Sequence, residues 1–219
     1  MKKFLLWDHD GILVDTERWY FAATQECLAN LDITLNQDTY LELMAQGHSC
    51  WELAKKIGRS DKAIAEAKNK RDKLYQNFLC MESIEIQDVV EVLQQLHKDY
   101  RMAVVSTARR EDLELIHRNR NLLKFFEFVL TFEDCTHAKP HPAPYLEALR
   151  RFKAPAFQAI AIEDSSRGLQ SAVSAEIDCI IVKTDFTMSQ DFTNAWAIIP
   201  SISRLPHTLS AQQNTATVS

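Results

Sequence analysis

Short apolar runs alternate with stretches of helical periodicity along this chain, and this alternation constrains the fold more than any other feature. Five such runs occupy residues 4–7, 102–105, 128–131, 159–162 and 179–182, with a weaker sixth at 195–199. Apolar residues at helical spacing lie between them, such as Val89, Leu93 and Leu96. Strands that alternate with helices of about 10–15 residues form a parallel sheet through crossover connections. The sequence therefore predicts an α/β fold whose parallel sheet carries helices on both faces.

Residues 16–81 are the exception, because no strand pattern appears between the first and second apolar runs. Tyr20, Thr24 and Cys27 follow a helical spacing, as do Ile64 and Ala67. The span far exceeds the ~12–15 residues beyond which structureless loops are uncommon. We expect residues 16–81 to form a helical cap domain, a candidate lid, inserted into a core domain of residues 1–15 and 82–200. Residues 201–219 are expected to form a polar, frayed tail.

Composition excludes several classes of function. The formal net charge is −5, so no basic face is expected to bind nucleic acid. No apolar run approaches the ~20 residues that span a bilayer, and the first residues lack the apolar segment of a signal peptide. Five scattered cysteines without a C-x-x-C pair indicate reduced thiols. We expect a cytoplasmic protein that binds neither nucleic acid nor membrane, of an oligomeric state that the sequence does not indicate.

The sequence Asp8-His9-Asp10-Gly11 directly follows the first apolar run. In an open α/β sheet, ligands bind at the carboxyl ends of the strands, where this motif is expected to lie. Two carboxylates held close together repel each other unless a proton or a cation intervenes. The pair is therefore a candidate nucleophile and acid for a metal-dependent reaction, and the alternative is a solvated loop end.

Three further polar clusters follow predicted strands, and each has a structural alternative. The hydroxyls of Ser106-Thr107 suit a phosphate, or they cap the next helix. Lys139, before Pro140, could neutralise a phosphate or stand in solvent beside a helix start. Glu163-Asp164-Ser165 could hold Mg²⁺, which prefers oxygen ligands, or could cap the following helix.

Taken in order, the four clusters resemble the motifs of the haloacid dehalogenase superfamily of phosphohydrolases. Finer features are similar to its β-phosphoglucomutase-like branch: the run from Asp10 to Glu17, the insertion after it, Lys139-Pro140-x-Pro142-x-x-Tyr145 and Glu163-Asp164-Ser165-x-x-Gly168. The resemblance covers the chain from Phe4 to about Val182. It implies a Rossmann-like core with an inserted helical cap, and a phosphatase that acts on a small phosphorylated metabolite such as a sugar phosphate.

The resemblance also implies a role for each acidic position. Asp8 would be the nucleophile that becomes an aspartyl phosphate. Asp10 would protonate the leaving oxygen and then take a proton from water. A Mg²⁺ cofactor would be held by Asp8, the backbone carbonyl of Asp10 and Asp164, with Glu163 as a ligand or as support for the ligands.

The same resemblance implies that Ser106, the Thr107 backbone and Lys139 bind the transferring phosphoryl group, whose charge Lys139 and Mg²⁺ would balance. Two positions depart from the usual pattern of this superfamily. His9 stands where an aromatic residue is most common, and Thr107 stands where Asn or Ser is frequent. Neither departure removes a catalytic group.

Hydrolysis is favoured over the intramolecular transfer of a phosphosugar mutase. The β-phosphoglucomutases carry a His on the first cap helix and an Arg in the cap loop, whereas this chain has Tyr20 and Cys50 at the matching places. Two alternatives remain: a phosphonate hydrolase that uses Lys55 or Lys56 as a Schiff base, and a non-catalytic scaffold of the same fold.

Four cap residues are candidate substrate contacts: Tyr20, His48, Ser49 and Trp51. Their mixed aromatic and polar character suits a small hydroxylated phosphoester. The alternative for the two aromatic side chains is packing inside the cap.

Overall fold

The structure is a computed structural model that describes residues 2–215, and it divides the chain into two compact units. The core unit joins the residues up to Val14 with those from Glu85 onward, and the inserted unit runs from Asp15 to Ile84. The insertion was predicted at 16–81, so its ends in the structure lie slightly outside the predicted ones. Residues 216–219 of the predicted tail lie outside the described residues.

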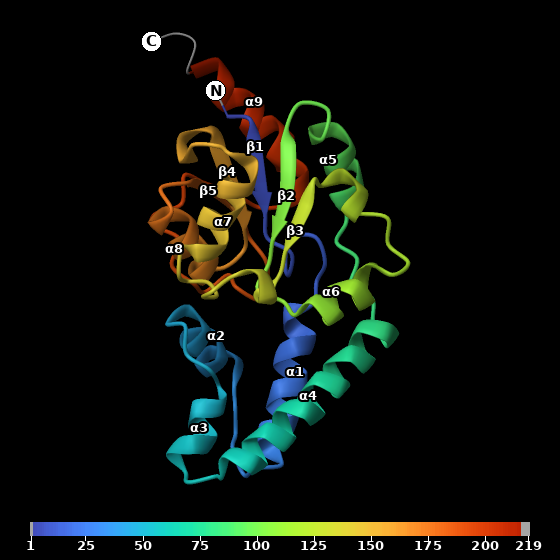
Figure 1. The fold of residues 1–219 in the computed structure, drawn as a ribbon, viewed down its shortest axis with the longest axis vertical. Coiled ribbons are helices and arrows are strands. Elements are labelled where there is room, and N and C mark those ends of the chain that lie inside the picture. The colour runs from blue at the N-terminus through green and yellow to red at the C-terminus, as the bar shows by residue number, and fades with distance from the viewer. Residues whose placement is uncertain (1, 216–219) are drawn as a thin grey trace. The chain divides into compact units, whose positions relative to one another are not determined.

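One parallel sheet of six strands forms the centre of the core unit. Its strands are β1 (Phe4–Trp7), β2 (Arg101–Val105), β3 (Phe128–Leu130), β4 (Ala159–Glu163), β5 (Asp178–Val182) and β6 (Ala197–Ile199). They lie in the order β3-β2-β1-β4-β5-β6 (Figure 1). In the register of the sheet, Leu6 pairs with Ala103 of β2 on one side and with Ala161 of β4 on the other. Each predicted strand is therefore present, and the predicted α/β fold class is confirmed.

Helices cover both faces of this sheet, because successive residues of a buried strand point to opposite sides. On the face that includes Leu5 and Trp7 pack α5 (Val89–Leu96) and α9 (Leu205–Thr215). On the face that includes Phe4 and Leu6 pack α7 (Ala143–Phe152) and α8 (Ser166–Ser174) (Figure 1). The remaining helix of the core unit, α6 (Arg110–His117), follows β2.

The predicted polar, frayed tail is wrong for residues 201–215. A 3₁₀ turn at Ile202–Arg204 leads into α9, and Ile202, Leu205 and Leu209 are buried in the core beneath the sheet. These three apolar residues recur at i, i+3 and i+7, which places them on one face of a helix. The Ser, Thr and Gln residues around them hide this short stripe from a reading based on composition.

The inserted unit is helical, as predicted, and no strand occurs among its residues, all of which the structure describes. Its helices are α1 (Glu17–Ala29), α2 (Gln37–Ala45), α3 (Trp51–Lys56) and α4 (Asp61–Met81). Aromatic contacts join α1 to α4: the Trp19 and Phe78 ring centroids lie 5.4 Å apart, and those of Tyr20 and Tyr75 lie 5.1 Å apart. Across residues 2–215, no helix is both long and apolar enough to cross a bilayer.

Candidate active site

The residues predicted for catalysis lie in loops at the carboxyl edge of the sheet. They are Asp8 and Asp10 after β1, Ser106 and Thr107 after β2, Lys139 before α7, and Glu163 and Asp164 at the end of β4. Because β2, β1 and β4 are neighbouring parallel strands, their carboxyl ends meet at one edge of the sheet. The edge gathers residues that are far apart in the sequence.

Lys139 lies at the centre of this group and is buried, with its side chain 2% exposed. Its ammonium Nζ donates to the Asp8 carboxylate at 2.8 Å and to the backbone carbonyl of Val105 at 2.7 Å. The same nitrogen lies 2.7 Å from Oε1 of Glu163. An ammonium has three N–H donors, so these three oxygens account for all of them. The alternative of a solvated lysine is therefore wrong.

Glu163 is the most deeply buried acid of the group. Its Oε1 accepts a hydrogen bond of 2.5 Å from the Tyr145 hydroxyl in addition to the Lys139 contact. Its Oε2 has no hydrogen-bond partner in the described part of the chain. Burial, and then the nearby charge of Asp8, raise the pKa of Glu163 to about 7 against the attraction of Lys139. A side chain at Gly168 would overlap this carboxylate, so only glycine fits there.

The acidic side chains meet the first requirement of a divalent cation site. Oxygen atoms of Asp8, Glu163 and Asp164 lie within 4.8 Å of one another, and all three residues are buried. One ammonium leaves most of this negative charge unbalanced, and carboxylate oxygens are the donors that Mg²⁺ prefers. Gly11, with φ of 78°, lies so close to the Asp164 carboxylate that a Cβ would overlap it. The donor set and the orphaned Glu163 oxygen together fit Mg²⁺.

Ser106 and Thr107 do not cap the next helix, so that alternative is wrong. The helix α6 begins at Arg110, and Arg109 is its N-cap residue. The Ser106 hydroxyl oxygen instead accepts from the backbone N–H of Ala108 at 2.9 Å, which closes a tight turn after β2. Capping is confirmed only for Ser165, whose hydroxyl oxygen accepts from the backbone N–H of Gly168 at 3.3 Å at the start of α8.

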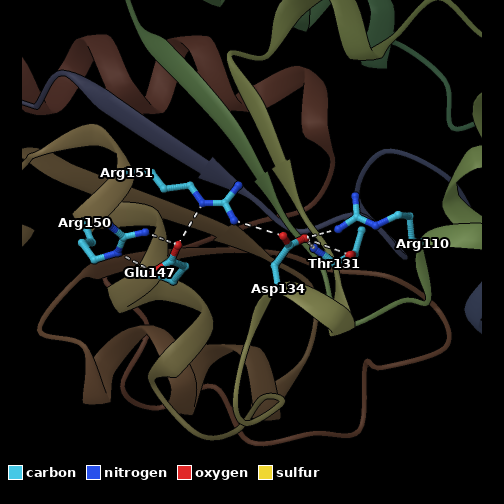
Figure 2. Close-up of polar contacts among 6 residues, drawn as sticks. All are labelled: Arg110, Thr131, Asp134, Glu147, Arg150 and Arg151. Carbon is cyan, nitrogen blue, oxygen red and sulfur yellow. Dashed lines mark hydrogen bonds and ion pairs between the residues drawn. The ribbon is translucent and has the colours of Figure 1, made fainter.

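A network of charged side chains fastens the segments that follow β2 and β3 to each other (Figure 2). At its centre Asp134 accepts hydrogen bonds from Arg110 of α6 at 2.7 Å and from Arg151 of α7 at 3.0 Å. The backbone N–H and the hydroxyl of Thr131 also donate to Asp134, each at 2.9 Å. Although burial opposes it, these hydrogen bonds lower the pKa of Asp134 to about 2. Since α6 follows the Ser106 turn and α7 follows Lys139, the network holds both segments in place.

The four candidate contacts of the inserted unit have two different environments. Trp51 is buried, and Tyr20 lies under the Arg71 guanidinium at 4.3 Å, so both aromatic side chains pack within this unit. His48 is exposed, with Nδ1 3.3 Å from the Glu52 carboxylate. Ser49 accepts a weak hydrogen bond of 3.4 Å from the backbone N–H of Trp51. Contact of these residues with a substrate stays a prediction.

Sequence reasoning missed two buried polar residues that the structure makes prominent. Arg71 occupies a core position of α4, in a stripe with Ala67 and Tyr75, and donates to Asp72 at 2.6 Å. His117 ends α6 and is also buried. A charged or polar residue on the apolar stripe of a helix was the available signal for Arg71.

Comparison with known families agrees with the geometry of this edge. A family model described as haloacid dehalogenase-like hydrolase matches residues 5–182. The chain belongs to this family. Its relatives include a phosphoglycolate phosphatase of Colwellia psychrerythraea, which is 28% identical over 200 residues that cover 87% of this chain and 88% of the relative. The predicted membership, and the prediction of an enzyme of the haloacid dehalogenase type, are confirmed.

Solved structures share the fold over nearly the whole chain. CbbY from Rhodobacter sphaeroides, in a variant bound to xylulose-(1,5)bisphosphate, aligns with a TM-score of 0.80 at 23% identity and covers 94% of this chain and 96% of CbbY. A β-phosphoglucomutase from Clostridium difficile aligns with a TM-score of 0.82 at 18% identity and covers 100% of both chains. At these identities the likeness concerns the fold alone.

Proposed function

We propose that this protein is a Mg²⁺-dependent phosphatase that hydrolyses a small phosphate monoester through an aspartyl phosphate on Asp8. The observation that carries the proposal is the buried ammonium of Lys139, which touches Asp8 and Glu163 within a cluster of carboxylates. A buried cluster of like charges is costly unless the site has a use for them. Phosphoryl transfer needs such fixed charges, because it depends mainly on positioning and on charge neutralisation.

Asp8, Asp164 and Glu163 are the residues proposed to hold Mg²⁺, together with the backbone carbonyl of Asp10. The orphaned Oε2 of Glu163 and the short distances among the three carboxylates support this assignment. When bound, Mg²⁺ supplies positive charge that balances the anionic substrate against the carboxylates.

In the first step, an Asp8 carboxylate oxygen attacks phosphorus and forms the aspartyl phosphate. The ester P–O bond breaks, and protonated Asp10 gives its proton to the departing alkoxide. In the second step, Asp10 takes a proton from water as the water oxygen attacks phosphorus. The bond between phosphorus and Asp8 then breaks, which releases inorganic phosphate and restores both carboxyl groups to their starting states.

Three groups are proposed to bind the transferring phosphoryl group: the Ser106 hydroxyl, the Thr107 backbone and the Lys139 ammonium. Lys139 already contacts the attacking carboxylate, so its charge would be shared between nucleophile and phosphoryl oxygens. The turn that Ser106 makes with Ala108 leaves the neighbouring Thr107 backbone at the tip of the β2 loop. The network centred on Asp134 supports these segments from behind.

The substrate class is proposed to be a small phosphorylated metabolite with hydroxyl or carboxyl groups. This proposal is supported by the names of the relatives, one a phosphoglycolate phosphatase and another solved with a sugar bisphosphate. Tyr20, His48, Ser49 and Trp51 of the inserted unit are the proposed substrate contacts. Location in the cytoplasm stays a prediction from the sequence.

Hydrolysis is favoured over mutase activity by the state of Cys50. The resemblance to β-phosphoglucomutases expects an arginine near this position of the inserted unit. Cys50 is instead a buried thiol, and burial raises its pKa to about 11. A neutral thiol offers no charge for a second phosphate, which an intramolecular transfer would require.

Release of inorganic phosphate from a panel of small monoesters tests the proposal, with and without Mg²⁺ after removal of divalent cations by EDTA. We expect release that depends on Mg²⁺ from a group of related esters. The variant Asp8→Asn is expected to remain folded and inactive, and Asp99→Asn, on the exposed surface, serves as the matched control. Turnover by purified Asp8→Asn would refute the nucleophile, and release that is indifferent to Mg²⁺ would refute the metal.

A further inference from the structure

Two buried histidines lie beside the acidic pair, and the proposed reaction does not use them. His9 stands between Asp8 and Asp10 and is fully buried, and His117 ends α6 with 8% of its surface exposed. Their Nε2 atoms lie 2.9 Å apart, and the two rings meet edge to face with centroids 5.1 Å apart. At that distance a hydrogen bond must join them, so one Nε2 carries a proton and the other accepts it.

The charge state limits which ring can be the donor. Burial, and then the neighbouring His9, lower the pKa of His117 to about 3, so this imidazole is neutral at working pH. A neutral imidazole carries a single N–H. In a neutral pair, the donor ring therefore has a bare Nδ1, and the accepting ring carries its proton on Nδ1.

The surroundings of the two Nδ1 atoms decide between the two arrangements. His9 Nδ1 lies 3.3 Å from a carboxylate oxygen of Asp10, where an N–H is attracted and a bare lone pair is repelled. His117 Nδ1 has no hydrogen-bond partner among the described residues, so a proton there would be an unsatisfied buried donor. Both conditions are met only when His117 donates and His9 accepts.

We infer that His117 is a positioning residue, which donates its Nε2–H to His9 and thereby directs the Nδ1–H of His9 at the Asp10 carboxylate. Asp10 is the proposed proton donor and acceptor, so the consequence for turnover rests on the proposed function. The distance of 3.3 Å is that of an ion pair, and such contacts often tighten when substrate binds. The pair would limit rotation of the Asp10 carboxyl group and so hold it in the orientation that proton transfer requires.

Packing alone would not need these residues. Two apolar rings of similar size would fill the same space without burying four ring nitrogens, which cost free energy when they lack partners. The direct Nε2 contact and the approach to Asp10 distinguish this pair from two histidines that merely pack in a core.

The tautomers are measured first, because this experiment needs neither substrate nor activity. The wild-type protein, with ¹⁵N-labelled histidine, is examined by NMR at neutral pH, and the resonances are assigned with the variants His117→Phe and His9→Phe. We expect His117 to be the Nε2–H tautomer and His9 the Nδ1–H tautomer. The reverse pair of tautomers, or a doubly protonated His9, would overturn the inference.

Turnover by single and double variants then tests the route through His9. We expect His117→Phe to lower kcat about 10- to 100-fold, as misplaced catalytic groups do, with little change in KM. His117→Gln retains an N–H donor and is expected to recover most of the loss, while His207→Gln, exposed on α9, is the control. The double variant His9→Phe with His117→Phe is expected to be no slower than His9→Phe alone.

Two kinetic results would overturn the inference: unchanged kcat in His117→Phe, or losses that multiply in the double variant. Failure of the proposed function is distinguishable from both. A folded wild-type protein that releases no phosphate from any ester refutes the phosphatase, and the NMR measurement still decides the direction of the hydrogen bond.

Discussion

Replacing Lys139 by methionine tests the charge arrangement of the site as a problem of stability. The change keeps the apolar stem of the side chain and removes the ammonium that contacts Asp8, Glu163 and the Val105 carbonyl. Methionine fills nearly the same volume, so the cavity contribution is small. The dominant cost is that two buried carboxylates lose the cation between them, and breaking such a pair typically costs about 3–5 kcal/mol.

For a chain of this length, that loss corresponds to a fall in Tm of roughly 6–20 °C. The assay is calorimetry and urea denaturation in EDTA at pH 7.5, so that no divalent cation substitutes for the ammonium. The loss is expected to shrink toward pH 5, because Glu163, whose pKa is already raised to about 7, takes up a proton there. Lys98→Met, at an exposed position, is the matched control and is expected to change stability by less than about 0.5 kcal/mol.

An unfolding free energy of Lys139→Met that equals that of the wild type would refute the reasoning. It would mean that the two carboxylates do not depend on this ammonium in the folded protein. A loss that grows as the pH falls would also contradict it, since protonation removes the unpaired charge.

Three further changes have expected outcomes. Gly168→Ala is expected to lower the unfolding free energy by about 1–3 kcal/mol despite better helix propensity, because its Cβ overlaps the Glu163 carboxylate; equal or higher stability in urea would contradict this. Without divalent cations, the raised pKa of Glu163 favours its protonated form, so stability should fall by up to about 3 kcal/mol as pH rises from 4.5 to 7. Glu163→Gln should remove that slope, and a slope that persists would exclude Glu163 as its source. Asp134→Ala is expected to cost about 2 kcal/mol and to raise KM, since the network in Figure 2 loses its centre; unchanged calorimetry and kinetics would show that it supports nothing.

The sheet and the residues at its edge could be predicted from the sequence, for a physical reason. The strands are buried on both faces, so they appear as short apolar runs that few other elements produce. Parallel strands place their carboxyl ends together, so polar residues after each run had to meet. Asp8, Lys139 and Glu163 were gathered by this argument before any distance was known.

Other features depend on packing that local sequence does not show. The helix α9 was missed because its apolar stripe is short and lies among polar residues. His117 was missed because its partner, His9, is more than 100 positions away, and only the fold brings the two rings within 2.9 Å. The capping alternative for Ser106 was wrong because α6 starts later than the pattern after β2 indicated.

Covalent labelling of Asp8 tests the central claim most directly. A monoester that supports turnover, carrying radiolabelled phosphate, is mixed with enzyme and Mg²⁺ and quenched in acid within one turnover. The account predicts label on the peptide that contains Asp8, none in Asp8→Asn, and loss of the label in alkali, as an acyl phosphate requires. Phosphate release by an enzyme that never carries label on Asp8 would contradict it.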